Sequence, residues 1–317
     1  MKDFYTYQQQ LDKLKSKGLI IKDENSAIEI LKKEGYYNII NGYSPLFKNG
    51  YKKFCKGTTF EDICCLYEFD KNLRSIVYKY SASIECYCKA LIAHEFSKNH
   101  GVDEKKYLTA AAFTQNKNSA TGVRDLITDC NQTITEALNR KSNKYREYIA
   151  HNYLYNGHVP MWVLIRALSF GTTSILYKYM VESEKEAIAA NFKLSAEQLE
   201  NILEVVVPFR NIVAHGERTY CARLVRKRLS TTLPVTTKLC LAKNQNGDNK
   251  YGRNDFLALM ICFKYLLPSI EFASFITEFN ANLVQLSEHL NASLVGKVKI
   301  QMGLSTESWK NLSRIKI

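Results

Sequence analysis

Apolar residues recur every three or four positions along most of this chain, which is the spacing that places side chains on one face of an α-helix. The longest such stretch follows Thr58-x-x-Glu61, which fits a helix-capping box, and it predicts one helix of up to about 40 residues ending near Gly101. Its apolar positions are Ile63, Leu66, Phe69, Leu73, Ile76, Tyr80, Ile84, Tyr87 and Leu91. We expect this helix to be the spine of the domain, although an unbroken apolar stripe also fits a kinked helix.

Further stretches share this helical periodicity. Helices are predicted over residues 4–18, 26–34, 121–139, 161–180, 255–267 and 269–291. Gly18 ends the first of these, and Pro160 precedes the fourth. A second capping box, Ser195-x-x-Gln198, begins another helix, and Pro208 either kinks that helix or occupies the first turn of a new one.

The regions between these helices are rich in turn-forming residues. Residues 35–54 are aromatic and glycine-containing, as expected of a packed connector, and residues 229–255 indicate a loop or a small β-hairpin. We therefore expect an all-α fold with soft internal boundaries, forming one compact unit. Its parts are an N-terminal helical module over 1–57, a helical core over 58–228, and an irregular segment with C-terminal helices over 229–317.

Composition favours a helical protein outside the membrane. Gly and Pro number only 14 and 5, whereas Tyr and Phe number 20 and 15, so turns are few and aromatic packing is heavy. The longest apolar run, Phe256 to Phe263, is too short to span a bilayer or to act as a signal sequence. The nine Cys residues lack the spacing of a metal or redox site and indicate buried thiols in a reducing compartment. We expect a cytoplasmic protein that needs neither cofactor nor metal.

The chain carries a large positive charge. Lys and Arg number 44 against 31 Asp and Glu, which gives a net charge of +13. Such a surplus raises the concentration of polyanions around a protein, and nucleic acid is the first candidate partner. The alternative is a basic surface that serves only solubility.

The sharpest local feature is Arg210-Asn211-Ile-Val-Ala-His215-Gly216, an Arg-x4-His element. Spacing alone is weak evidence, because about 0.7 matches to Arg-x4-6-His are expected by chance in this composition. A second match, Arg146 to His151, is indeed present, and we interpret it as structural because it lacks the Arg-Asn pair and runs into a loop-like stretch.

RNA cleavage through its own 2′-hydroxyl gives such a pair a chemical role. The reaction needs a proton acceptor that titrates near neutral pH and a cation facing the phosphate, which His and Arg supply without a metal. His215 precedes Gly216, so we place it in the last helical turn, where the helix dipole favours the imidazolium form. The structural alternative is a surface Arg210 and a His215 that bonds free carbonyls at the helix end.

The same element resembles the Arg-Asn-x3-His signature of HEPN ribonucleases, and its setting resembles the Abi-like abortive-infection family. Four further segments carry this resemblance. They are residues 35–43 (GYYNIINGY), residues 66–74 (LYEFDKNLR) with Ile84-Glu85, Pro160-Met-Trp162 with Ser169-Phe-Gly171, and Met302-Gly303 with Trp309. The resemblance therefore extends over most of the chain.

The resemblance implies an all-helical HEPN core and metal-independent RNA cleavage, as in the related HEPN domains of RNA-guided CRISPR ribonucleases. It also implies a role in phage defence, or as a toxin held in check by an antitoxin that is a protein or a non-coding RNA. Arg210 matches the phosphate-binding arginine, Asn211 a polar residue that orients the site, and His215 the catalytic imidazole. Glu85 matches an acidic position on the long helix and is a candidate supporting residue. The alternative is a catalytically inactive module of this fold that binds RNA or a protein.

A basic run follows the motif. Its members are Arg218, Arg223, Arg226, Lys227 and Arg228, against one acidic residue, Glu217. Beside a phosphate-cleaving site this run predicts a track for the RNA backbone, and the alternative is a solvated helix face.

The need for both an acid and a base in the reaction predicts a homodimer. Cleavage needs a base for the 2′-hydroxyl and an acid for the departing 5′-oxygen, but each chain supplies one credible His. Residues five apart on a helix point about 140° from each other, so Arg210 and His215 fit a tight site within one chain poorly. We therefore expect two copies to face each other across a two-fold axis and share one composite site.

Overall fold

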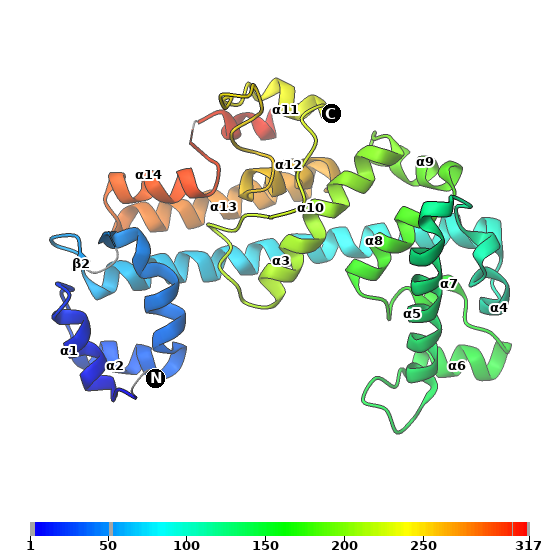
Figure 1. Ribbon diagram of the computed structural model, residues 1–317, viewed down its shortest axis with the longest axis horizontal. Helices are drawn as coiled ribbons and strands as arrows, with labels where there is room; N and C mark the ends of the chain where they lie inside the picture. The colour runs from blue at the N-terminus through cyan, green and yellow to red at the C-terminus, as the bar shows by residue number, and fades with distance from the viewer. Residues whose placement is uncertain (1–3, 51–52, 306, 316–317) are drawn as a thin grey trace.

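The computed structural model describes residues 4–50, 53–305 and 307–315, and it confirms the all-α fold class. Helix α3 (Phe60–His100) crosses the molecule, with α1 and α2 near one of its ends and α4 to α7 near the other (Figure 1). Within the described ranges, the named strands are β1 (Lys48–Asn49) and β2 (Lys53–Phe54), which pair antiparallel.

Helix α3 confirms the long predicted helix, but its capping box lies one residue later than predicted. Thr59 caps the helix, because its hydroxyl accepts the Asp62 N–H at 3.1 Å and its own N–H donates to the Asp62 carboxylate at 2.8 Å. The prediction of Thr58 and Glu61 was wrong because a parallel bridge to Ile20 keeps the backbone extended through Thr59. Gly101, with a φ of +76°, ends the helix as expected.

The N-terminal helices precede α3. Helix α1 (Tyr7–Lys15) and α2 (Glu24–Glu34) agree with the two predicted helices, and the chain leaves α1 through Gly18 at a φ of +88°. The aromatic connector then forms a short π-helix, η1 (Tyr37–Asn41), and a 3-10 turn, η2 (Ser44–Phe47). Ile39 and Ile40 of η1 are buried, so the connector is packed as predicted.

A group of shorter helices surrounds the C-terminal end of α3, near His100. These are α4 (Glu104–Tyr107), η3 (Ala110–Ala112), η4 (Lys117–Ser119), α5 (Ala120–Leu138), α6 (Glu147–Asn156), α7 (Met161–Leu164), α8 (Phe170–Tyr179) and α9 (Glu182–Ala190). The prediction of a single helix over 161–180 was wrong. Ser169 begins α8 by accepting the Thr172 N–H, and the Leu168 carbonyl accepts from Lys89 instead of from a helical N–H.

Helix α10 (Ala196–Ala214) carries the Arg-x4-His element. The predicted capping box of Ser195 and Gln198 is present, and Pro208 lies inside one continuous helix rather than opening a new one. Nine of its 19 residues are buried, and it packs against α3, α8, α9 and α12. Tertiary packing thus offsets the hydrogen bond that Pro208 removes.

The C-terminal helices close the core. They are α11 (Pro234–Lys238), α12 (Phe256–Leu266), α13 (Ser269–His289), α14 (Ala292–Gln301) and η5 (Glu307–Ser313). Residues 229–255 are mostly irregular, as predicted, but they also contain α11. A single antiparallel bridge between Lys243 and Asn249 forms a minimal hairpin in this segment. Helix α13 packs along α3, where Asn282 donates to the Phe69 carbonyl at 2.9 Å.

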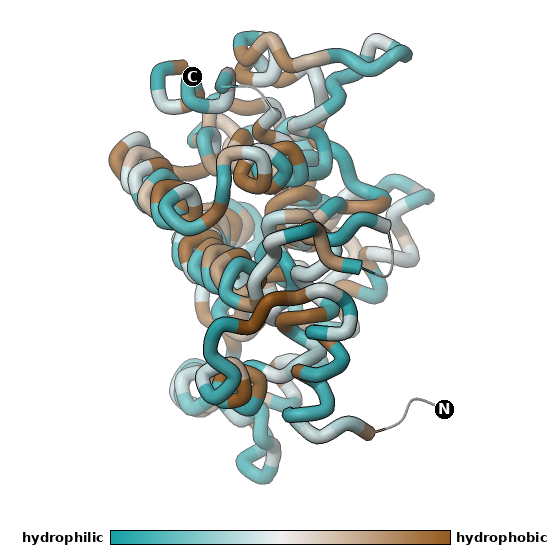
Figure 2. Tube along the Cα trace, turned by 90° about the vertical axis from the view of Figure 1, so that its left-hand side faces the viewer, coloured by the Kyte–Doolittle hydropathy of each residue, from teal (hydrophilic) through white to brown (hydrophobic). Residues whose placement is uncertain are grey.

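One continuous apolar core joins these parts. It includes Leu11 of α1, Ile84 of α3 and Phe263 of α12, each almost fully buried. In Figure 2, brown and teal alternate around the helical turns, as expected of helices with one apolar face. No helix in the described part of the chain combines the length and the apolar character needed to cross a membrane.

The cysteines are only partly buried. All nine are free thiols, and Cys88, Cys130 and Cys262 are buried. Cys86 and Cys240 are exposed, which corrects the expectation that the thiols lie in the interior. Cys86 lies on the face of α3 that is exposed to solvent.

Candidate functional site

The three motif residues lie at the end of α10. Arg210 is half-buried, whereas Asn211 and His215 are exposed. The backbone N–H of His215 donates to the Asn211 carbonyl at 3.0 Å, and Gly216, with a φ of +71°, then turns the chain away. The His215 imidazole makes no hydrogen bond or ion pair with any residue that the structure describes. The structural alternative, in which this ring bonds free helix-end carbonyls, therefore finds no support.

Arg210 is held by Glu85 of α3. Its Nη2 lies 3.0 Å from Glu85 Oε2, and Glu85 Oε1 lies 2.7 Å from Lys89 Nζ. Lys89 also donates to the Leu168 carbonyl at 2.7 Å, in the break between α7 and α8. The Glu85 and Lys89 side chains are only 11% and 14% exposed, so their attraction is screened less than that of a surface pair.

One atom of the Arg210 guanidinium is buried without a hydrogen-bond partner among the described residues. This atom is Nε, which lies beside the paired Nη2. Leaving a buried donor unpaired is costly, so a water molecule or a ligand is expected to complete the site.

His215 lines a pocket of about 670 Å³, within the size range of small-ligand sites. The pocket lies where α10 ends, against η1 and the first half of α3. Its lining residues are Tyr37, Asn38, Asn41, Gly42, Tyr43, Tyr67, Arg74, His215, Gly216, Glu217, Arg218, Cys221 and Ala222. The lining contains two arginines and one carboxylate, so it suits an anion better than a cation.

Buried Asp70 organises the walls of this pocket. It accepts hydrogen bonds from the Tyr43 hydroxyl at 2.7 Å, from Arg74 Nη1 at 2.9 Å, and from the backbone N–H groups of Thr219 and Tyr220. Burial raises the pKa of the Asp70 carboxyl, and these donors oppose that effect. Asp70 therefore fixes the connector before α3 and the loop after His215 to the same turn of α3.

The tyrosines around Asp70 act in packing. Tyr43 stacks on Tyr220 with ring centroids 5.9 Å apart, and both are almost fully buried. Burial raises the pKa of both hydroxyls. Tyr220 is therefore part of the core.

The structure does not bring Arg210 and His215 into one pocket of a single chain. Arg210 faces Glu85 in the middle of α3, while His215 faces the pocket near Arg74. Residues 74 and 85 are separated by about 16 Å along a helix axis.

The basic run is irregular rather than helical, so it does not form the solvated helix face that the sequence left open. Arg218 donates to the Gly42 carbonyl at 2.7 Å, Arg223 lies 3.3 Å from the buried Asp255, and Lys227 pairs with Glu204. Arg226 and Arg228 are exposed, and neither side chain has an ion pair within the described ranges. These two cations are the most available members of the run.

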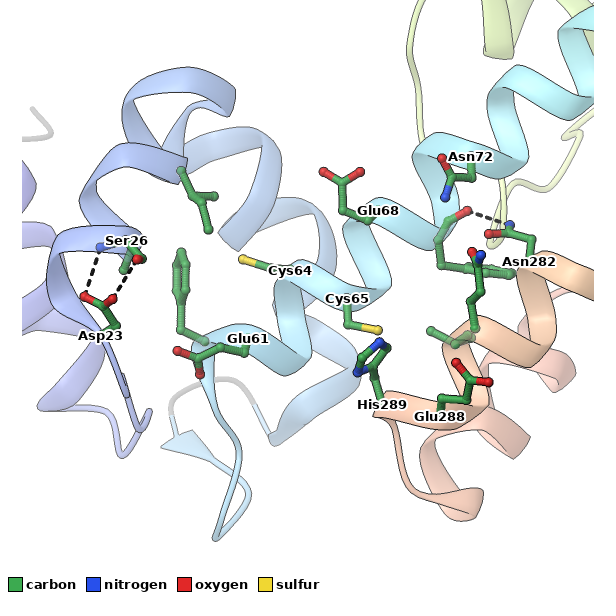
Figure 3. Close-up of a pocket in the computed structure, with 16 residues that line it drawn as sticks. Asp23, Ser26, Glu61, Cys64, Cys65, Glu68, Asn72, Asn282, Glu288 and His289 are labelled. Atoms are coloured by element: carbon green, nitrogen blue, oxygen red, sulfur yellow. Dashed lines mark hydrogen bonds between the residues drawn. The ribbon is translucent and has the colours of Figure 1, made fainter.

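A second pocket, of about 610 Å³, lies between α2, α3 and α13 (Figure 3). Its polar rim carries four carboxylates, from Asp23, Glu61, Glu68 and Glu288. Burial raises the pKa of the Cys64 thiol in this pocket to about 12, so the thiol stays protonated and is a poor nucleophile. The negative rim repels a polyanion, so this pocket suits an anionic ligand less well than the pocket beside His215 does.

Sequence reasoning missed two residues of the site. Lys89 follows Glu85 by one helical turn, and this spacing was the available signal for an ion pair on α3. Asp70 lies in the 66–74 segment quoted for the family resemblance, but its backbone partners are about 150 residues away in sequence. No local pattern indicates such a contact.

Comparison with known proteins extends this picture. The family model described as Abi-like protein matches residues 29–221, which is more than half of the chain. The matched range includes Asp70, Glu85, Arg210 and His215, but it ends before Arg223 and before the segments at Met302 and Trp309. No curated protein and no solved structure matches the chain significantly. The chain belongs to the Abi-like protein family, which associates it with abortive infection.

Proposed function

We propose that this protein is a metal-independent endoribonuclease of the HEPN kind that acts in abortive infection, on RNA in the cytoplasm. The observation that carries the proposal is the position of His215, whose imidazole is exposed in a pocket that also holds Arg74 and Arg218. An exposed imidazole beside fixed cations is an arrangement that suits cleavage of a phosphodiester.

The reaction proceeds by attack of a ribose 2′-oxygen on the adjacent phosphorus. A base removes the 2′-hydroxyl proton as the new P–O bond forms, and an acid protonates the departing 5′-oxygen as the old bond breaks. The products are a 2′,3′-cyclic phosphate and a 5′-hydroxyl. His215 carries the proton, and Arg210 faces the negative charge that develops on the phosphate.

Glu85 and Lys89 are positioning residues in this scheme. The carboxylate between two cations fixes the Arg210 guanidinium, and the unpartnered Nε leaves one donor for a phosphate oxygen or a water. Asn211, exposed on the last turn of α10, orients the substrate beside them.

A homodimer completes the site. Arg210 and His215 of one chain face different surroundings, and each chain supplies one His for a reaction that needs both an acid and a base. Two copies related by a two-fold axis supply both groups around one phosphate. RNA approaches over Arg226 and Arg228, and an antitoxin, either a protein or a non-coding RNA, restrains the activity.

One observation favours a second candidate function. Because Glu85 already neutralises Arg210, the fold also suits a catalytically inactive module that binds RNA or a protein partner. The two candidates differ in whether His215 acts chemically.

Induced expression in bacteria separates them. Wild type should stop growth and degrade RNA, while Arg210→Ala and His215→Ala should do neither yet remain soluble and helical. Arg146→Ala and His151→Ala, from the competing spacing match on and beside α6, should behave as wild type. Equal growth arrest by wild type and His215→Ala would exclude the catalytic assignment and favour the binding module.

A further inference from the structure

The short π-helix η1 presents one exposed aromatic ring at the pocket beside His215. Tyr37 is 74% exposed, whereas Ile39 and Ile40 in the same five residues are almost completely buried. The two isoleucines anchor the segment in the core and leave Tyr37, Asn38 and Asn41 facing outward. π-Helical turns are rare and frequently occur at functional sites.

Tyr37 is the one tyrosine of this pocket whose ring is free to contact a ligand. Tyr43 is buried and donates its hydroxyl to Asp70 at 2.7 Å. Tyr67 is 8% exposed, donates to Glu34, and has its pKa raised by burial to about 12. Packing and hydrogen bonding therefore account for those two, but not for Tyr37.

Two amides lie beside this ring. Asn38 lines the pocket and donates through Nδ2 to the Glu34 carbonyl at 2.9 Å, which leaves its Oδ1 available as an acceptor. The Asn41 side chain is exposed and makes no hydrogen bond within the part of the chain that the structure describes. A side-chain amide offers both a donor and an acceptor, which matches the edge of a nucleobase.

The cations of the pocket are held in place. Arg218 is fixed by the Gly42 carbonyl, at the end of η1, and Arg74 is fixed by Asp70. The pocket thus combines an exposed ring, base-reading amides and positioned cations, in a volume within the range that small ligands occupy.

We infer that this pocket binds one unpaired nucleotide of a single-stranded RNA. Its base stacks on Tyr37, its edge bonds Asn41 and Asn38, and its phosphate faces Arg218, which brings the next phosphate toward His215. A base within a duplex is already stacked and paired, so it cannot enter. The inference rests on the proposed function for the identity of the polymer, and it names the substrate class as single-stranded.

Binding tests this inference without cleavage. Wild type is titrated into a fluorescently labelled, fully 2′-O-methylated single-stranded RNA, and into the same strand annealed to its complement, with fluorescence anisotropy as the readout. The variants are Tyr37→Ala, Tyr37→Phe and Asn41→Ala. Tyr155→Ala is the matched control, because Tyr155 is 77% exposed on α6, away from the pocket.

Loss of one stacked base should weaken single-strand binding by Tyr37→Ala roughly tenfold or more, while Tyr37→Phe keeps the ring and stays within about twofold of wild type. Asn41→Ala should weaken binding and change base preference. Tyr155→Ala should bind as wild type, and the duplex should bind weakly whichever residue occupies position 37. Helical circular dichroism should be the same in all variants, because Tyr37 is not part of the core.

Three results would overturn the inference. The first is equal single-strand affinity of wild type and Tyr37→Ala, and the second is no single-strand binding by wild type at all. The third is duplex binding that depends on Tyr37 to the same extent. Cleavage of unmodified RNA is measured separately. If wild type binds single-stranded RNA through Tyr37 but never cleaves it, the proposed nuclease function is excluded, while the nucleotide-binding role of this pocket still holds.

Discussion

Arg210 on α10 and Glu85 on α3 form an ion pair, with Nη2 and Oε2 3.0 Å apart, although 125 positions separate them in the sequence. Lys89 lies 2.7 Å from the other oxygen of the same carboxylate. The candidate catalytic arginine is therefore held against α3, the spine of the fold, and we expect this ion pair to contribute to stability.

Replacing Glu85 should cost stability. Glu85→Gln leaves Arg210 and Lys89 close together without the carboxylate between them, and we expect a loss of about 2 kcal/mol, between the values for exposed and buried ion pairs. Urea denaturation followed by circular dichroism measures this. Glu29→Gln, which breaks an exposed pair with Lys32, is the control and should cost much less than Glu85→Gln. Equal losses of unfolding free energy in the two variants would show that Glu85 contributes no more to stability than an exposed ion pair does.

The exposed members of the basic run should contact the RNA backbone. Arg226→Ala with Arg228→Ala should lower the slope of log affinity against log salt by about 1.4, at roughly 0.7 for each lost contact with a single strand. Sequence preference should change little. By contrast, Arg223→Ala should mainly destabilise the fold, because it leaves the buried Asp255 without its cation. A salt slope that the double variant leaves unchanged would assign Arg226 and Arg228 to the solvated surface.

The Cys64 thiol, in the second pocket between α2, α3 and α13, should react slowly with alkylating reagents. Burial raises the pKa of Cys64 to about 12, and because the thiolate is the reacting form, roughly one thiol in ten thousand is reactive at pH 8. Peptide mapping after brief iodoacetamide treatment should show Cys86, which is exposed on the same helix, labelled far faster than Cys64. Raising the pH by one unit should speed Cys64 labelling about tenfold. Comparable rates at pH 8 would contradict the burial of this thiol.

A shared site should make His215→Ala dominant. When wild type exchanges subunits with a roughly ninefold excess of this variant, about one wild-type subunit in ten remains in a wild-type homodimer. Activity per wild-type subunit should fall accordingly, as measured by cleavage of a fluorogenic RNA. Once exchange has been verified, activity that follows only the wild-type concentration would show that each chain works alone.

The sequence predicted elements that local signals define. The Ser195 and Gln198 box begins α10, and apolar spacing defines α3 over its full length. The break between α7 and α8 escaped prediction because the apolar pattern continues through Ile165 and Leu168, both buried, while the backbone leaves the helix. The cap of α3 shifted because a bridge to Ile20, about 40 residues earlier, decides where the helix begins.

For the candidate site as well, the sequence predicted the residues that belong to a local motif but not those whose contacts are long-range. Arg210, Asn211 and His215 follow from one local motif, and Glu85 from a family resemblance. The pairing of Arg223 with Asp255 joins two irregular segments, and Asp70 binds backbone N–H groups that have no signature in the sequence. Contacts of this kind depend on tertiary packing, so only the fold reveals which cations of the basic run are occupied.

The chemistry at His215 is the central claim, and the ends of the RNA products test it most directly. Purified wild type is incubated in excess EDTA with a defined single-stranded RNA, and the products are analysed by mass spectrometry beside those of His215→Ala. Wild type should yield 2′,3′-cyclic phosphate and 5′-hydroxyl ends, a single 2′-O-methyl group at a cleaved position should abolish that cut, and His215→Ala should yield no product. Products with 5′-phosphate ends, activity that EDTA removes and magnesium restores, or cleavage by His215→Ala at the wild-type rate would contradict the account.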